Sequence, residues 1–298
     1  MNKLFLVKKG ATIGLVCPAF HPRTNEEVNE FLTMLTKRGY KYKLGKTMML
    51  KEGYLAGSDE ERAQDLMDMF LDPKIDAIFC YKGGYGCSRI IDKLDFDLIK
   101  KNPKLIVGFS DITVLLNVIY QKCSFPTLHG DMGICLRHAP LNTVNNFFDL
   151  MENGFLAPLK NSEQELTIIN NGCAEGILVG GNLSLIYNLL GTPYEIDMKD
   201  KILFIEDVEE APYSIDRMLC ALKLAGKLKE LKGVICGTFS SCTSESDQTV
   251  DELLDFYLHP LNIPVISNFE CGHTNPFINL PIGLKVRLNT KEKSVTVL

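Results

Sequence analysis

The sequence predicts an α/β fold in two parts, a parallel-sheet N-terminal domain and a smaller β/α C-terminal domain. In the first half, short apolar runs alternate with amphipathic helical stretches, a pattern typical of β-α-β units with a parallel sheet. In the second half, shorter strands surround at least two helices. Residues 142–172 between them are rich in Asn, Gly, Pro and charged side chains. We therefore expect domains over 1–150 and 173–298, joined by a linker over 151–172.

The expected elements of the N-terminal domain follow from apolar spacing and helix caps. Two capping-box patterns, at 24–27 and 58–61, each precede apolar residues at helical spacing. The apolar run of the first strand ends at Pro18, which cannot continue a strand inside a sheet. In order, we expect a strand over 11–18, helices over 24–39 and 58–70, a strand over 76–84, a helical stretch from 88, a strand over 104–110 and a helix over 111–122.

The C-terminal domain contains more strand. We expect strands over 176–181, 201–207, 231–239, 263–269, 284–289 and 293–298, and helices over 216–225 and 250–257.

Composition excludes several classes of protein. The formal net charge of −5 and the lack of basic runs argue against nucleic acid or an anionic membrane as partner. No stretch approaches the roughly 20 apolar residues of a membrane span, and the N-terminus has no secretory signal pattern, so we expect a cytoplasmic protein. Ten cysteines are scattered, mostly in apolar runs and without C-x-x-C spacing. We interpret them as reduced and buried, and expect neither a metal nor an organic cofactor.

The strongest local signal for chemistry is the segment VGFSDIT, where an apolar strand runs directly into Ser110 and a helix begins at once. A serine at such a turn lies at the carboxyl edge of a parallel sheet, and the amide of Asp111 points to where an oxyanion would form. The segment lacks the second glycine of a G-x-S-x-G motif. The alternative interpretation is that Ser110 is only a helix N-cap.

A glycine-rich turn, YKGGYG, follows the preceding strand and should reach the same edge of the sheet. Gly83 or Gly84 could supply a second oxyanion donor, although a tight turn alone also requires glycine. Lys82 and Arg89 flank the turn, and either could pair with a substrate carboxylate.

A serine nucleophile needs a base, and the chain has five histidines. His273 lies in a Gly-, Asn- and Pro-rich loop directly after a strand, where catalytic side chains are often presented. His129 is the rival base. Glu206, at the end of an apolar strand, could orient the imidazole. The acidic residues that follow it, Asp207, Glu209 and Glu210, leave that choice open.

Five segments in this order, GFSDIT, YKGGYG, GGNLSLIYNLLGTPYEID, FIEDVEEAPYSIDRML and GHTNPFINLPIG, resemble the LD-carboxypeptidase family of serine peptidases. The resemblance spans nearly the whole chain. It implies a flavodoxin-like N-terminal domain that carries the nucleophile and a swivelling β/α C-terminal domain that carries the other two members of a Ser110–Glu206–His273 triad. It also implies that the amides of Asp111 and of Gly83 or Gly84 form the oxyanion hole.

The function that this resemblance implies is release of the terminal D-alanine from a murein tetrapeptide by a cytoplasmic homodimer. One alternative is an amidase of the microcin-immunity branch, acting on an aminoacyl-nucleotide antibiotic; another is a non-catalytic small-molecule binding protein. Lys82 stands where the family usually has arginine, and the chain has no tryptophan, which the immunity branch uses for stacking. The cation that binds the substrate carboxylate stays open between Lys82, Arg89 and Arg217.

Overall fold

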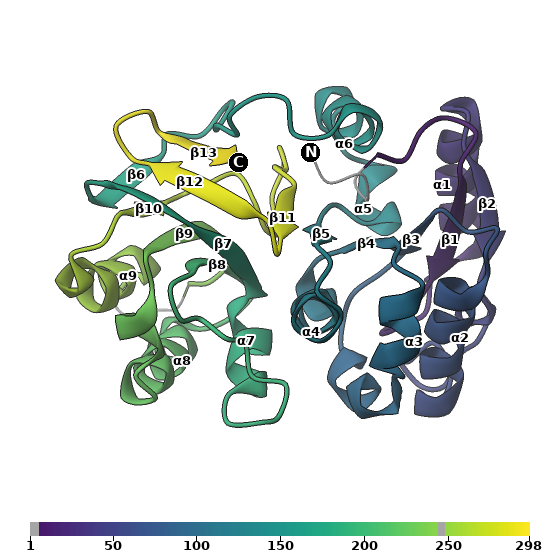
Figure 1. Cartoon of the computed structure of the whole chain (residues 1–298), viewed down its shortest axis with the longest axis horizontal. Helices are drawn as coiled ribbons and strands as arrows, with labels where there is room; N and C mark the ends of the chain where they lie inside the picture. The colour runs from purple at the N-terminus through teal and green to yellow at the C-terminus, as the bar shows by residue number, and fades with distance from the viewer. Residues whose placement is uncertain (1–5, 244–247) are drawn as a thin grey trace. The chain divides into compact units, whose positions relative to one another are not determined.

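The computed structural model describes residues 6–243 and 248–298, and the chain divides into two compact units, 1–156 and 157–298 (Figure 1). Each unit has its own sheet, helices and buried apolar core. The predicted α/β class, with a parallel-sheet N-terminal part and a shorter β/α C-terminal part, is confirmed.

The sheet of the first unit is parallel. Its strands are β1 (Thr12–Val16), β2 (Lys41–Leu44), β3 (Ala77–Cys80), β4 (Leu105–Gly108) and β5 (Thr127–His129). They lie in the order β2-β1-β3-β4-β5, and each neighbouring pair is parallel. This is the flavodoxin-like order, in which ligands bind outside the carboxyl ends of the strands near the reversal between β1 and β3. The turns that carry Gly83 and Ser110 follow β3 and β4, at that edge of the sheet.

Helices cover both faces of this sheet. They are α1 (Asn25–Lys37), α2 (Asp59–Leu71), α3 (Phe96–Lys101), α4 (Thr113–Cys123), α5 (Gly133–Leu136) and α6 (Leu141–Asn153). Figure 1 shows α2, α3 and α4 on one side of the sheet. Phe79 of β3 packs edge-on against Phe147 of α6. The predicted caps are present: Thr24 accepts from the Glu27 amide, and Ser58 with Glu61 forms a complete capping box.

Two expectations for the first unit were wrong in detail. The helical stretch expected from 88 is a pair of 3₁₀ turns, and α3 begins only after Asp95, whose carboxylate accepts from the Leu98 amide. Residues 142–153, expected to be irregular, form most of α6. Although this segment is rich in asparagine, Phe147, Phe148 and Met151 lie on one face of the helix and are buried. The boundary between the units, after residue 156, consequently falls inside the expected linker.

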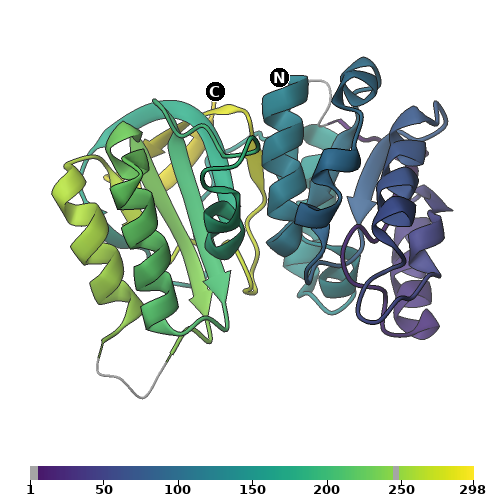
Figure 2. The same cartoon turned by 90° about the horizontal axis from the view of Figure 1, so that it is seen from below.

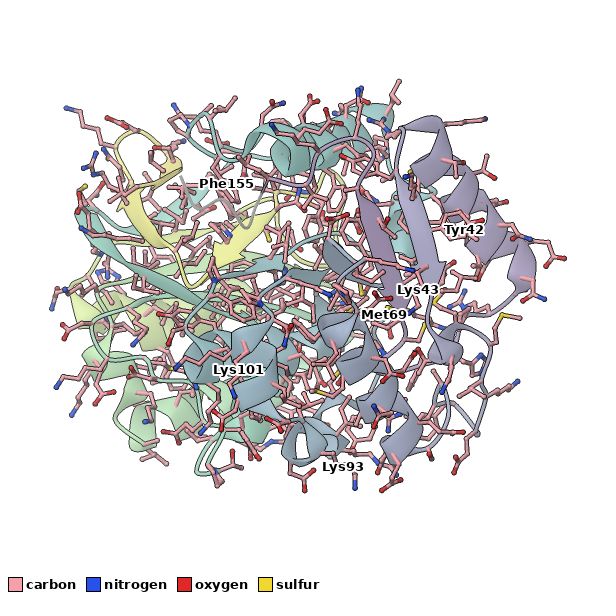
Figure 3. All side chains as sticks on the ribbon, turned by 45° about the vertical axis from the view of Figure 1, so that its right-hand side comes forward. Tyr42, Lys43, Met69, Lys93, Lys101 and Phe155 are labelled. Carbon is pink, nitrogen blue, oxygen red and sulfur yellow. The ribbon has the colours of Figure 1, made fainter. Side chains whose placement is uncertain are left out.

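The strand β2 was missed because its sequence, KYKL, is short and mostly exposed. Figure 3 shows Tyr42 and Lys43 on this strand, and Tyr42 is 41% exposed. Lys43 forms an ion pair with Asp72 at 2.8 Å. Lysine on an edge strand hinders pairing with another chain, so this polar pattern suits the position of β2 beside β1 alone within the first unit.

The sheet of the second unit is mixed. Its strands are β6 (Thr167–Asn170), β7 (Cys173–Asn182), β8 (Ile202–Val208), β9 (Gly233–Ser240), β10 (Val265–Ser267), β12 (Lys285–Asn289) and β13 (Ser294–Val297). The short strand β11 (Leu280–Ile282) is not part of this sheet. The order is β13-β12-β7-β8-β9-β10-β6, with a parallel centre from β7 to β10 and antiparallel strands outside it. The helices are α7 (Leu183–Leu189), α8 (Pro212–Leu224) and α9 (Val250–Leu258). Figure 2 shows α8 and α9 side by side along this sheet.

Every cysteine is a free thiol, and most are buried. Within residues 6–243 and 248–298, no helix is both long enough and apolar enough to cross a bilayer. The same part of the chain holds no group of three or more His, Cys, Asp or Glu side chains placed to bind a metal ion.

Candidate active site

Ser110 occupies a strained turn between β4 and α4. It opens the 3₁₀ turn Ser110–Ile112 and has a φ of 60°, which is rare for a residue with a side chain. Such strain costs about 1–3 kcal/mol and is concentrated at functional sites. The half-buried Ser110 is not a helix cap, because Phe109 and Ile112 hold the N-cap positions of the 3₁₀ turn and of α4. The N-cap interpretation is therefore wrong.

The glycine turn after β3 lies directly against this serine. A Cβ atom added to Gly83 would lie 3.1 Å from Ser110 Cβ and 3.2 Å from Ser110 Oγ. Gly84 has a φ of 114°, and a Cβ there would come within 2.3 Å of the Phe20 ring. Both glycines thus allow the backbone of the turn to approach the serine and the loop after β1. This proximity suits the predicted role of their amides.

The three cations that the sequence singled out have different surroundings. Lys82 Nζ donates to the carbonyl of His21 at 3.0 Å, and burial, with a smaller contribution from Arg23, lowers the pKa of Lys82. Arg89 is paired with Asp59 at 3.0 Å. Arg217 is exposed on α8, with its guanidinium 6.0 Å from the Tyr213 ring. Lys82, which directly precedes Gly83, is therefore the cation adjacent to the serine turn.

In the second unit, His273 and Glu206 form a hydrogen-bonded pair. His273 Nδ1 lies 2.8 Å from Glu206 Oε2; the carboxylate is fully buried and the imidazole is 22% exposed. Burial alone would lower the pKa of His273, but the hydrogen bond and charge of Glu206, with the charges of Asp207 and Glu209, raise it above its ordinary value. Because Nδ1 faces the carboxylate, Nε2 is the ring nitrogen that would exchange a proton with a substrate.

The backbone around the His273–Glu206 pair is irregular and is held in place by specific contacts. The pairing of β8 with β9 shifts register between Ile205 and Asp207, so Glu206 lies where the ladder is irregular, with the extra residue on β9. Gly272 has a φ of 117°, and a Cβ there would lie 2.8 Å from Glu206 Oε2. The histidine loop is fixed to β9 because Ser240 Oγ donates to the His273 carbonyl at 2.6 Å.

The acidic residues after Glu206 have other surroundings. Asp207 accepts hydrogen bonds from the Asn182 side chain and from both the amide and the hydroxyl of Ser184, so it ties β8 to the start of α7. Burial, together with the charge of Glu206, raises the pKa of Asp207. Glu209 is exposed in a left-handed turn. The structure therefore brings Glu206, rather than its neighbours, to His273.

The other candidate histidines differ from His273. His129 is fully buried on β5, paired with Gly108, and its ring lies 5.9 Å from that of Phe109. His259 is exposed and pairs with Asp255 at 3.2 Å. A buried carboxylate held against an imidazole, the arrangement that orients a general base, is the environment of His273.

Sequence reasoning used Asp111 only for its amide and overlooked two buried side chains near the glycine turn. The Asp111 carboxylate accepts from the Cys87 amide at 2.8 Å, and Arg62 donates to the Gly86 carbonyl at 2.9 Å. The sequence could not have identified Arg62, because it belongs to no short motif. Only the structure shows that this charged side chain is buried beside the glycine turn.

Comparison with known proteins gives a consistent assignment. Family models described as the LD-carboxypeptidase N-terminal and C-terminal domains match residues 13–130 and 175–288. The chain is 40% identical to the probable murein peptide carboxypeptidase of Bacillus subtilis, over 98% of this chain and 92% of that protein. The MccF-like protein of Bacillus anthracis has a TM-score of 0.90 at 28% identity, covering 98% of each chain. MccF in complex with glutamyl sulfamoyl guanosine has a TM-score of 0.89 at 25% identity, over 98% of this chain and 97% of that one.

Proposed function

Because the chain belongs to the LD-carboxypeptidase family, we propose that it releases the terminal D-alanine of a murein tetrapeptide by hydrolysing the preceding L,D amide bond. The observation that carries this proposal is the His273–Glu206 pair, an imidazole held at 2.8 Å by a fully buried carboxylate. The name of the Bacillus subtilis relative supports murein peptides as the substrate class.

In the proposed mechanism Ser110, His273 and Glu206 act as a triad. His273 Nε2 takes the Ser110 proton as Oγ attacks the carbonyl carbon, and a tetrahedral oxyanion forms. His273 then gives that proton to the D-alanine nitrogen, the C–N bond breaks, and an acyl-Ser110 ester remains. Water, deprotonated by His273, attacks the ester, and the proton returns to Ser110 as the shortened peptide leaves. Glu206 keeps its charge and stabilises the imidazolium throughout.

The glycine turn and Lys82 have separate roles in this proposal. The amides of Asp111 and of Gly83 or Gly84 donate to the oxyanion, and one such donor typically contributes about 10²- to 10³-fold to kcat. Lys82 supplies a positive charge for a substrate carboxylate beside the turn. Arg89 is the weaker candidate because Asp59 already occupies its guanidinium.

A second candidate function is hydrolysis of an aminoacyl-nucleotide amide, as in the immunity branch. Its support is the similarity to MccF in complex with glutamyl sulfamoyl guanosine, together with an aromatic cluster beside the glycine turn. In that cluster, Phe20 and Tyr54 have ring centroids 5.1 Å apart, and Tyr54 and Tyr85 6.4 Å. Both tyrosines are exposed enough to stack on a base.

The deciding experiment follows the mass of L-Ala-γ-D-Glu-diaminopimelate-D-Ala incubated with the wild-type protein and, in parallel, with Ser110→Ala. We expect loss of one D-alanine with the wild type alone. An unchanged tetrapeptide together with cleavage of glutamyl sulfamoyl adenosine would favour the second function.

Labelling of Ser110 by a fluorophosphonate separates both enzymatic functions from a non-catalytic binding protein. An activated serine should react, whereas a binding protein should not.

We further propose that the enzyme works in the cytoplasm as a homodimer, as the family resemblance implies. Light scattering on the purified protein tests the assembly, and a monomer at micromolar concentration would contradict it.

A further inference from the structure

One peptide group of the glycine turn is held at both ends by buried charged side chains. The group joins Gly86 and Cys87, and Tyr85 separates it from the Gly83-Gly84 pair. Its carbonyl oxygen accepts from Arg62 Nη1 at 2.9 Å, and its N–H donates to Asp111 Oδ2 at 2.8 Å. Both Arg62 and Asp111 are 0% exposed.

The cation is itself fixed by several bonds. Arg62 projects from α2, and the same Nη1 donates to the Pro18 carbonyl after β1 at 2.6 Å. Its Nη2 pairs with Asp59 and its Nε donates to Gly57. A guanidinium offers five donors in a rigid fork, so this one side chain fixes the loops after β1 and β3 to each other.

The anion is the residue that follows the proposed nucleophile. Burial raises the pKa of Asp111, while the hydrogen bonds from the turn and the charge of Arg62 oppose the increase. Gly86 is required at this point, because its φ is 143° and an added Cβ would lie 2.7 Å from Arg62 Nη1. The two opposite charges thus compensate each other across a single peptide dipole in an interior of low dielectric constant.

We propose that Arg62 and Asp111 are positioning residues that clamp the Gly86–Cys87 peptide and thereby fix the oxyanion-binding turn against Ser110. This inference rests on the proposed function, and it adds a role for the Asp111 side chain to that of its amide. The clamp acts on the turn, not on the substrate. Its loss should therefore reduce stabilisation of the transition state more than binding of the ground state.

The test uses Asp111→Ala and Asp111→Asn, with Asp65→Ala as the matched control. Asp65 is a buried carboxylate of the same unit that holds the amides of Lys46 and Thr47 instead. We expect Asp111→Ala to lower kcat about 10²-fold with a KM near the wild-type value, as for a misplaced catalytic group. Asp111→Asn keeps an oxygen acceptor for the Cys87 amide and should recover most of that loss. Asp65→Ala should reduce the melting temperature but retain kcat.

The labelling rate of Ser110 by a fluorophosphonate gives a second readout that needs no murein substrate. In this reaction Oγ bonds to phosphorus, fluoride leaves and His273 takes the proton, while the phosphoryl oxygen requires the same turn. Asp111→Ala should slow labelling to the same extent as kcat. If the wild type is labelled but does not cleave the tetrapeptide, the proposed substrate is wrong and the clamp is still tested.

Arg62→Lys keeps the inference testable if Asp111→Ala does not fold. Lysine cannot reproduce the fork, so this variant should also slow labelling. Wild-type labelling in Asp111→Ala or in a folded Arg62→Lys, or an equal loss of kcat in Asp65→Ala, would each overturn the proposal.

Discussion

The two units hold the side chains of the proposed triad by different means. In the first unit, backbone geometry places Ser110: a φ of 60°, a glycine turn whose missing side chains allow close approach, and the start of α4. In the second unit, a contact between two side chains places His273, because Glu206 holds its imidazole at 2.8 Å. Backbone placement does not tolerate an added Cβ in the glycine turn, whereas the side-chain pair depends on one buried charge.

The largest effects are expected for variants that test whether Ser110 and His273 act together in catalysis. Ser110→Ala and His273→Ala should each reduce kcat by on the order of 10⁶-fold, because neither residue acts without the other. The double variant should be no slower than either single one. The measurement is single-turnover release of D-alanine. A double variant much slower than both would show that serine and histidine contribute independently, against a triad.

The next largest effect is expected when the charge of Glu206, in the second unit, is removed. Glu206→Gln should lower kcat about 10⁴-fold, the scale seen when the carboxylate of a triad is neutralised. It should also move the acid limb of kcat/KM to lower pH, because the bond and charge that raise the pKa of His273 are gone while burial, which lowers it, remains. In the wild type this limb should lie above the ordinary histidine value of about 6.5.

Glu210→Gln is the matched control for that pH profile. Glu210 is partly buried and lies 3.4 Å from Ser184 Oγ, so its neutralisation should leave the acid limb in place. An acid limb that does not move in Glu206→Gln would mean that another group controls it.

The same contrast explains which site residues the sequence could predict. An apolar strand, a serine and an immediate helix form a local pattern, so the sequence alone singles out Ser110 and the glycine turn as candidates. Glu206 and His273 are separated by 66 intervening residues, and three acidic residues close behind Glu206 compete with it. The family resemblance, and then the 2.8 Å contact with His273, distinguish Glu206 from them. The Arg62–Asp111 clamp joins α2 to the serine turn through a peptide group, and no sequence pattern encodes that.

The fold, like the candidate site, was predictable where the pattern is local in sequence and not where it depends on distant contacts. Buried strands such as β3 and β4 are fully apolar and were found. The exposed edge strand β2 and the asparagine-rich α6 were missed, because their structure depends on tertiary contacts: β2 on pairing with β1, and α6 on packing against Phe79.

A smaller effect should follow from crowding the side-chain pair without removing a charge. Gly272→Ala adds a Cβ 2.8 Å from Glu206 Oε2, and Gly226→Ala, also at positive φ, adds one with nothing within 4 Å. Both should lose about 1 kcal/mol of unfolding free energy through backbone strain. Only Gly272→Ala should also lose kcat, because Glu206 must shift. Equal kcat in the two variants would mean that Glu206 tolerates displacement.

The smallest effect on activity is expected at Glu270, a carboxylate that connects the start of the loop carrying His273 to residues 162–164. Glu270 is fully buried, and it accepts from the amides of Ser162, Glu163 and Gln164 and from the Ser162 hydroxyl. Burial would raise the pKa of Glu270, but these backbone bonds outweigh it and lower the pKa. A depressed carboxyl pKa stabilises the fold above the unfolded value of about 4.3, and this contribution disappears as pH falls through the folded value.

Glu270→Gln should therefore cost about 1.5–3 kcal/mol at pH 7, the scale of hydrogen bonds to a charged group, and progressively less below pH of about 4. Urea unfolding of the second unit at pH 7 and under acid conditions measures both values, with the exposed Glu163→Gln as control. Activity at pH 7 should fall less than in Gly272→Ala, because Ser240 still holds the His273 carbonyl. A destabilisation that is the same at both pH values would assign the loss to packing instead of charge. Packing of the Glu270 side chain, and not its charge, would then hold the loop that carries His273. The hydrogen bond between Glu206 and His273 would be the one charged contact that distinguishes the placement of His273 from the backbone placement of Ser110.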